Sequence, residues 1–258
     1  MSFGEGASRF LRREHMLVHC WKAFSQAIAP FSPVNEEPEL EPEAVILNID
    51  LRPVDTRHAI SALRHYLELM EQQMPIVQAC EFASLAAERP QGNDEEEQSL
   101  YFNEVSYLEQ LFEDDLVPTM RYSFIVFLHT VLETRLFAFC AAMQRERRLP
   151  IDISMIRGQG IEQAQCYLTK LVGISVGDFT EWPELRTFQT VRNCIVHSYG
   201  YLDPRDDRHK KLRVIAKQQL GLSITHNDRI SIDASFCQRH LAHISTFFRR
   251  LFEAAGWQ

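Results

Sequence analysis

The sequence predicts an all-α protein: a helical bundle with a small β-hairpin before its last helix and a helical extension at its N-terminus. Glycine and proline are sparse, at 10 and 11 in 258 residues, which favours long helices over many short strands. Apolar residues recur at helical spacing, as at Leu63, Leu67 and Met70, which indicates helices with one buried face.

The first part of the chain reads as an extension of the bundle. An amphipathic helix is expected over residues 7–29, and prolines then interrupt any helix before an acidic linker at 35–43. A long helix is expected over 56–88. A break over 90–98 follows, with a proline, one glycine and an acidic run, so we divide the chain into an N-terminal extension, 1–95, and a helical domain, 96–258.

The second part carries a series of periodic segments. Helices are expected over 100–114, 117–147, 161–171, 182–198 and 235–255. Alternating residues in 222–225 and 229–233, on either side of His226–Asn227–Asp228, predict the hairpin. On the last helix five side chains are expected to face inward: Phe236, Leu241, Ile244, Phe248 and Leu251.

Composition and charge limit the functional classes. A formal net charge of −8 argues against a surface that coats nucleic acid broadly, although it allows a local basic groove. The six cysteines contain no C-x-x-C pair, so we expect reduced core cysteines and no metal site. No apolar leader is present and no stretch approaches a membrane span of about 18 apolar residues, which predicts a cytoplasmic protein without membrane contact.

The segment Val191–Tyr199, VRNCIVHSY, concentrates the residues suited to chemistry. Helical geometry places five apolar side chains of this helix on one arc: Leu185, Phe188, Val191, Ile195 and Val196. Arg192 falls inside that arc and needs a carboxylate, a phosphate or an exit to solvent. Asn193 and His197 are one turn apart and share a flank.

These residue types suit phosphodiester cleavage. Arg192 can brace a phosphate, and His197 can move protons near neutral pH. Asn193 can orient the histidine or a substrate hydroxyl. In RNA the neighbouring 2′-hydroxyl supplies the nucleophile and leaves a 2′,3′-cyclic phosphate, so the chemistry needs no metal or other cofactor. The alternative is that an Arg-x4-His spacing occurs here by chance.

Residues Arg192–His197 resemble the Arg-x4-His signature of the HEPN superfamily, which prefers a polar residue after the arginine, here Asn193. The surroundings are similar too. A long apolar helix carrying Glu133 precedes the motif helix, and a hairpin and a final helix follow it, as in many larger members. The resemblance covers roughly residues 98–258.

This resemblance implies an all-α, HEPN-like bundle and a homodimer in which two motifs form one composite site across a cleft. It also implies a metal-independent endoribonuclease acting on RNA, as in toxin–antitoxin pairs and antiviral defence. Arg192 and His197 would be its catalytic pair, supported by Asn193. An antitoxin or other regulatory partner protein is expected. Some members are non-catalytic scaffolds or nucleotide-binding regulators, which is the alternative function.

Two neighbours of the motif have both a functional and a structural interpretation. Tyr199 completes an Arg-x4-His-x-Tyr pattern; in some toxins of that form the tyrosine is adenylylated, whereas the alternative is a tyrosine that packs at a helix end. Glu133 is either a buried counter-charge for Arg192 or part of a solvent-facing stripe with Tyr122 and His129.

A basic stretch follows the motif. Its candidate RNA-binding residues are Arg208, Lys210, Lys211 and Arg213. The alternative is a solvated loop whose charge is balanced by aspartates: Asp203, Asp206 and Asp207. Four further histidines look isolated or surface-like, and no role is assigned to them: His209, His226, His240 and His243.

Overall fold

The described part of the chain is mostly helical, with a two-stranded antiparallel hairpin before the last helix, as predicted. The computed structural model describes residues 51–218 and 220–257. The helix expected over 7–29 and the acidic linker over 35–43 lie outside the described residues.

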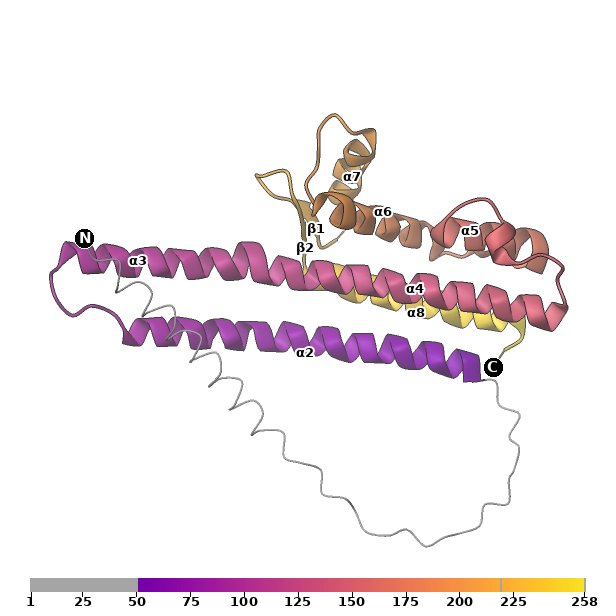
Figure 1. Ribbon diagram of the computed structural model, residues 1–258, viewed down its shortest axis with the longest axis horizontal. Helices are drawn as coiled ribbons and strands as arrows, with labels where there is room; N and C mark the ends of the chain where they lie inside the picture. Colours follow the sequence, from indigo (N-terminus) through magenta and orange to yellow (C-terminus); the bar gives the residue numbers. More distant parts are fainter. Residues whose placement is uncertain (1–50, 219, 258) are drawn as a thin grey trace, which may run out of the picture. The chain divides into compact units, whose positions relative to one another are not determined.

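Two long helical runs lie side by side in the first half of the described chain (Figure 1). Helix α2, Leu51–Ala87, contains Pro75 and continues through it. Helix α3, Glu95–Gln110, leads through a π-helical turn, Leu111–Leu116, into α4, Val117–Arg147. The bounds of α4 coincide with the predicted helix.

The ends of these helices follow from local chemistry. The Asp94 carboxylate accepts a hydrogen bond from the Glu96 amide at 2.9 Å, which caps the start of α3. Three glutamates in the first turn of α3 favour the positive end of the helix dipole. Helix α4 ends where Arg148 takes the left-handed conformation.

Helix α4 lies at the centre of the hydrophobic core. Its residues Leu128, Leu132 and Leu136 are all 0% exposed, and α4 contacts α2, the motif helix and the last helix, α8 (Ala234–Ala255). All five side chains expected to face inward from the last helix are buried: Phe236, Leu241, Ile244, Phe248 and Leu251. The apolar face predicted for the last helix is therefore the face that it buries in this core.

Helix α2 falls within the predicted N-terminal extension, yet it belongs to this same core. Ile60, Leu63 and Leu67 are buried together with residues of α4 and α8. Arg121 of α4 also forms a bidentate pair with Glu71 of α2, with both N–O distances at 2.8 Å. The described helical unit therefore includes α2 as one of its layers.

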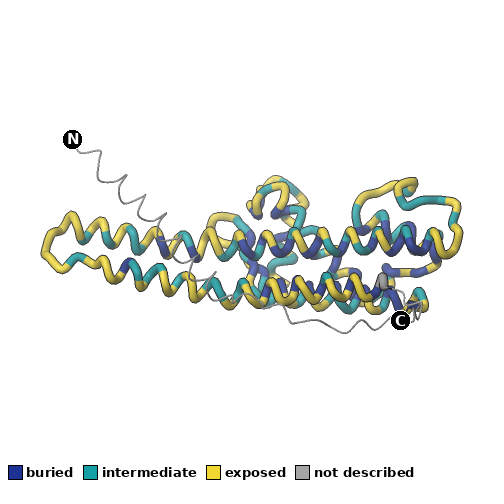
Figure 2. The backbone as a smooth tube through the Cα atoms, turned by 60° about the horizontal axis from the view of Figure 1, so that its bottom comes forward, coloured by how far each residue is buried: buried dark blue, intermediate teal, exposed yellow. Residues whose placement is uncertain are grey.

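The far ends of α2 and α3 form a separate, thinner region. A small apolar cluster joins them, and its three buried residues are Leu85, Leu108 and Phe112. Figure 2 shows that exposed residues dominate there, whereas buried residues gather where α4 meets the later helices. Leu100 and Phe102 of α3 are more than half exposed, at 53% and 57%.

The continuous helical run Glu95–Arg147 is long and apolar enough to cross a membrane, with an 18-residue window of mean hydropathy 1.6, 44% of which is buried inside the protein. The expectation that no stretch approaches a membrane span is therefore corrected. The expectation failed because it considered only uncharged runs, and this helical run contains His129, Glu133 and Arg135 among its apolar residues. Leu128, Leu132 and Leu136 show why this helix is apolar, since each packs in the core.

The second half of the described chain builds the site. Its elements are α5 (Gly160–Tyr167), a π-helical turn (Leu168–Val172), α6 (Trp182–Ser198), α7 (Asp207–Gln218), β1 (Leu222–Ile224) and β2 (Ile230–Ile232). The strands pair antiparallel with Leu222 opposite Ile232. The hairpin is tied to the segment after α6, because the Leu202 amide donates to the Asp228 carbonyl at 2.8 Å.

Two histidines lie inside the core, and the rings of both lie near that of Phe188. His240, which looked isolated or surface-like in the sequence, is 0% exposed, and its ring centroid lies 4.2 Å from that of Phe236 and 4.9 Å from that of Phe188. His129 is 1% exposed, so a solvent-facing stripe through it is also wrong. Both positions lie on the buried faces of their helices, and burial lowers the pKa of His129 to about 4 and of His240 to about 3.

Candidate functional site

The motif lies on the last two turns of α6, the helix expected over 182–198. Leu185, Phe188 and Val191 are 0% exposed and anchor the helix against the core, whereas Val196, expected on the same buried arc, is 46% exposed. The helix ends at Tyr199, which takes the left-handed conformation with φ of 52°. This anchoring leaves the flank that carries Asn193 and His197 free to face another element.

That element is α7, and a pocket of about 310 Å³ lies between the two helices. Four residues of each helix line it: Thr190, Asn193, Cys194 and His197 from α6, and Arg208, His209, Lys211 and Leu212 from α7. Cys194 and Leu212 are buried, whereas His197 is exposed. The pocket thus combines apolar side chains with two histidines, an amide and two cationic groups.

Arg192 reaches this pocket only through its neighbour. Its Nη1 donates to Oδ1 of Asn193 at 3.1 Å, and Arg192 itself is absent from the pocket lining. Its Nε is buried and has no hydrogen-bond partner among the described residues. The pKa of His129 is low mainly because the ring is buried. The positive charge of Arg192 is the second cause, since it opposes protonation of that ring.

Glu133 does not form the expected ion pair with Arg192 within the described residues. It lies one turn after His129 on α4, and its Oε2 is 3.7 Å from Nδ1 of that histidine. Its other oxygen approaches the first residue of α5: a Cβ added to Gly160 would lie 2.9 Å from it. The carboxylate is therefore directed toward the N-terminus of α5, where the helix dipole favours a negative charge.

Tyr199 is held by a cluster of aromatic rings around one arginine. The guanidinium carbon of Arg229 lies 4.4 Å from the ring centroid of Tyr199, 5.1 Å from that of Tyr122 and 5.8 Å from that of Tyr201. The Tyr199 hydroxyl is 3.0 Å from Oγ1 of Thr119. Its ring therefore packs at the helix end, as one interpretation expected, while 49% of the residue stays exposed.

The same cluster fixes the chain just after the motif. Tyr122 donates a hydrogen bond to the Ile230 carbonyl, and burial raises its pKa to about 12. Gly200, at φ of 81°, lies against that hydroxyl, so any side chain there would meet both steric strain and Tyr122. Arg229 was missed by sequence reasoning, because nothing in an alternating strand marks an arginine as the centre of an aromatic cluster.

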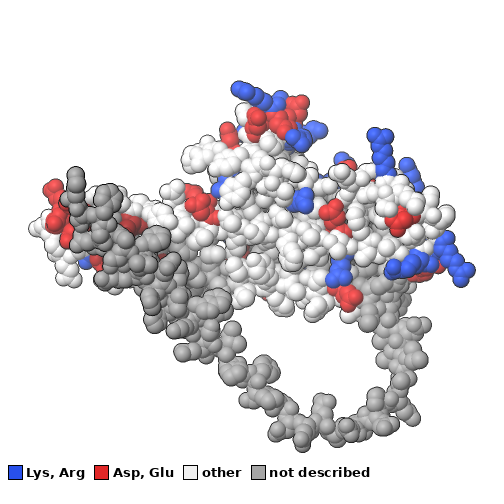
Figure 3. All heavy atoms as spheres, viewed as in Figure 1, with Lys and Arg blue, Asp and Glu red and all other residues white. Residues whose placement is uncertain are grey.

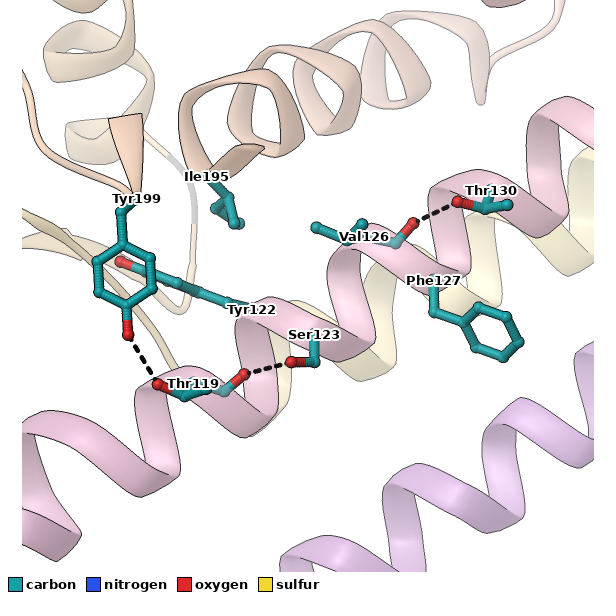
Figure 4. Close-up of a pocket in the computed structure, with 8 residues that line it drawn as sticks. All are labelled: Thr119, Tyr122, Ser123, Val126, Phe127, Thr130, Ile195 and Tyr199. Atoms are coloured by element: carbon teal, nitrogen blue, oxygen red, sulfur yellow. Dashed lines mark hydrogen bonds between the residues drawn. The ribbon is translucent and has the colours of Figure 1, made fainter. Parts of the chain in front are cut away.

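An apolar pocket of about 370 Å³ borders this cluster between α4 and the end of α6 (Figure 4). Its lining includes Val126, Phe127, Ile195 and Tyr199. Phe127 is 56% exposed, which is unusual for a phenylalanine on a central helix. The motif helix therefore borders a polar pocket toward α7 and an apolar one toward α4.

Most of the basic residues expected to bind RNA have acidic partners. Arg208 pairs with Asp206 at 2.7 Å and Lys210 with Asp207 at 2.7 Å. Figure 3 shows the corresponding mixture of charges over α7. The Asp206 carboxyl, which accepts hydrogen bonds from the Arg208 guanidinium, has its pKa lowered to about 2. Aspartates therefore balance the charge of this stretch, as the alternative interpretation expected, but most of the stretch forms helix α7 and not the solvated loop of that interpretation.

The two remaining basic candidates differ. Arg213 bridges to the hairpin, since its Nη2 is 2.9 Å from Oδ1 of Asp228. Lys211 lines the pocket and forms no ion pair with any described residue. Of the four candidates, the structure therefore brings Arg208 and Lys211 to the motif, whereas Lys210 is absent from the lining and Arg213 has a structural contact.

His209 was given no role in the sequence analysis, yet it faces the motif. It lies in the first turn of α7 and lines the pocket together with His197. Its Nδ1 accepts a hydrogen bond from the Asp203 amide at 2.8 Å. No sequence pattern links the two histidines, because their proximity depends on how α7 folds back on α6.

Two further findings complete the description of the site. Among the residues that the structure describes, no group of three or more His, Cys, Asp or Glu side chains is arranged to hold a metal ion. Comparison of the chain with protein-family models, with curated proteins and with solved structures finds no match.

Proposed function

We propose that this chain is a metal-independent endoribonuclease of HEPN type that acts in the cytoplasm as a toxin or antiviral effector. The observation that carries the proposal is the pocket between α6 and α7. There His197 and Asn193 of the predicted motif meet Lys211 and Arg208 in a volume of about 310 Å³. A proton-transferring ring beside cationic side chains is the combination that a phosphodiester requires.

The proposed reaction uses the RNA's own 2′-hydroxyl. His197 takes the proton from the 2′-oxygen while that oxygen bonds to phosphorus, and the bond from phosphorus to the 5′-oxygen breaks. The imidazolium then returns a proton to the departing 5′-oxygen, so the histidine ends unchanged. The products are a 2′,3′-cyclic phosphate and a 5′-hydroxyl.

Cationic groups have the task of stabilising the charge that builds on the phosphate oxygens. Lys211 is suited to this because no described carboxylate competes for it. Arg192 would act through Asn193 in one protomer, since their side chains are hydrogen-bonded and only Asn193 lines the pocket. In the homodimer that we propose, Arg192 of both copies would serve one composite site.

The apolar pocket beside the motif supports the proposal that a second copy of the chain covers this surface. Phe127 and Val196, at 56% and 46% exposure, leave apolar surface next to the helix that carries Arg192 and His197. Covering such surface is favourable by about 25 cal/mol for each Å² removed from water. Sedimentation should show a dimer, and Phe127→Glu should convert it to a monomer with impaired cleavage.

The test of the proposed activity is cleavage of single-stranded RNA by the purified full chain in EDTA. Wild type should cut, and His197→Ala should lose at least about 100-fold in rate. His226→Ala is the matched control, because that exposed histidine lies in the hairpin turn. Undiminished cutting by His197→Ala would refute the proposal.

A non-catalytic role as an interaction scaffold or nucleotide-binding regulator is the second candidate. It is favoured by the far ends of α2 and α3, where Ile76, Phe102 and Tyr107 are each more than half exposed, at 54%, 57% and 55%. Such surface suits an antitoxin or another regulatory partner protein. If expression arrests growth and Arg192→Ala relieves the arrest, the catalytic function is supported; arrest that persists in the variant supports the scaffold.

A further inference from the structure

We propose that His209 is a second RNA-contacting residue of the pocket, which donates a hydrogen bond from Nε2 to a non-bridging oxygen of the phosphate being cleaved. This inference rests on the proposed ribonuclease function and assigns the site a group that no motif contains. His209 and His197 come from different helices, α7 and α6, and both line the same pocket.

The hydrogen bond at Nδ1 determines which ring nitrogen can donate. A backbone amide can only donate, so the 2.8 Å contact from the Asp203 amide requires a lone pair on Nδ1 of His209. The neutral ring must then carry its proton on Nε2. A proton on Nδ1 would replace this hydrogen bond with two opposed N–H groups.

The loop that supplies this amide is itself ordered. The Asp203 carboxylate accepts from the Arg205 amide at 2.8 Å, and the Asp206 carboxylate accepts from the Arg208 amide at 2.8 Å. These bonds fix the turn that leads into α7. Because both the amide and the ring are anchored, Nε2 of His209 is the nitrogen left to serve the pocket.

The two histidines thus differ in what they can do. His197 is exposed and no hydrogen bond ties its ring to a described residue, so it can take and return a proton. His209 is a fixed donor that transfers no proton, and a donor preset toward developing charge stabilises a transition state. The charged groups around His209 are Arg208 and Lys211 in the pocket and the Asp203 and Asp206 carboxylates in the adjoining loop.

Two substitutions distinguish the roles of Nδ1 and Nε2 of His209. In His209→Asn the amide oxygen can still accept from the Asp203 amide, but nothing replaces Nε2. In His209→Gln the amide nitrogen reaches the position of Nε2 and can donate. Single-turnover cleavage by the full chain in EDTA should fall about 100-fold in His209→Asn and stay within about 10-fold of wild type in His209→Gln. His226→Asn, on the exposed hairpin turn, serves as the control.

Three further readouts exclude a merely structural role. His209→Asn should keep the melting temperature of wild type and the shape of its pH–rate profile, and its affinity for a non-cleavable 2′-O-methyl RNA should fall far less than its cleavage rate. By contrast, Lys211→Gln should weaken that affinity and lower its salt dependence. Loss of a titration from the pH–rate profile of His209→Asn would overturn the donor role, because it would show that His209 transfers protons.

The proposal also fails if His209→Asn cleaves within about 3-fold of wild type, or if both substitutions lose activity and melting temperature alike. Either result would refute the role of His209 alone. The ribonuclease function would still be supported if wild type cleaves RNA and His197→Ala does not. If wild type itself fails to cleave RNA, the ribonuclease function falls first and His209 loses its role with it.

Discussion

The two buried histidines predict a loss of stability as the pH falls from 7 to 5. The pKa is about 4 for His129 and about 3 for His240, against an ordinary value of 6.5. The unfolded chain therefore takes up two protons as the pH falls below 6.5, while the folded chain does not. Stability from this source is constant above pH 7 and decreases as the pH falls toward the folded pKa values.

The size of the effect follows from the two pKa shifts. At pH 5 each histidine is protonated in the unfolded chain and neutral in the folded one, which costs about 1.36 kcal/mol per pH unit below 6.5. The expected loss is about 2 kcal/mol for each ring, or about 4 kcal/mol for the pair. Burial is the main cause of both low pKa values. Protonation is opposed further by Arg192 at His129, and by Arg239 and His243 at His240.

The neighbouring groups identify the substitution that tests this reasoning. Both ring nitrogens of His240 lack hydrogen-bond partners among the described residues, and the ring packs between Phe188 and Phe236. His240→Phe should therefore be tolerated at pH 7. In urea unfolding followed by circular dichroism, it should reduce the loss of unfolding free energy between pH 7 and 5 by about 2 kcal/mol. An equal loss in wild type and variant would refute the explanation.

Three more predictions concern the support of the site. Gly200→Ala should destabilise the fold by about 3 kcal/mol in urea unfolding, because the left-handed backbone and the Tyr122 hydroxyl both oppose a Cβ; a change below about 0.5 kcal/mol would contradict this. Arg229→Met should cost about 1 to 2 kcal/mol and change the near-UV circular dichroism of the tyrosines; an unchanged spectrum would argue against the aromatic cluster. In hydrogen exchange, amides of α3 should exchange well before those of α4, since α3 has a single buried side chain, Leu108. Equal protection of the α3 and α4 amides would contradict this expectation.

The long helices could be predicted from the sequence because apolar residues recur at helical spacing in α6 and α8 and occupy most sides of α4. The bounds of α4 and α6 agree with those expected, and the inward face of α8 was identified residue by residue. Local pattern was sufficient because α6 and α8 each bury one apolar face, whereas α4 is buried on most sides at the centre of the core. The hairpin was also predicted, since its strands alternate around a turn that holds Asp228 at φ of 58°.

The sequence predicted only the part of the site that lies on a single helix, α6. The flank shared by Asn193 and His197 follows from helical spacing, whereas the role of α7 depends on Leu212, which is 1% exposed and helps line the pocket. A run of mixed charges does not reveal that packing, so His209 was missed. One interpretation of Glu133, its pairing with Arg192, failed for a related reason: the carboxylate lies by His129 on its own helix and by Gly160 at the start of α5.

The central claim is that His197 cleaves RNA through the substrate's own 2′-hydroxyl. Its most direct test is a DNA oligonucleotide with one ribonucleotide, incubated with the full chain in EDTA and analysed by mass spectrometry. We predict a single cut directly after the ribonucleotide, with a 2′,3′-cyclic phosphate on one fragment, and no cut by His197→Ala. Cleavage at deoxyribonucleotides, or the same product from His197→Ala, would contradict the claim.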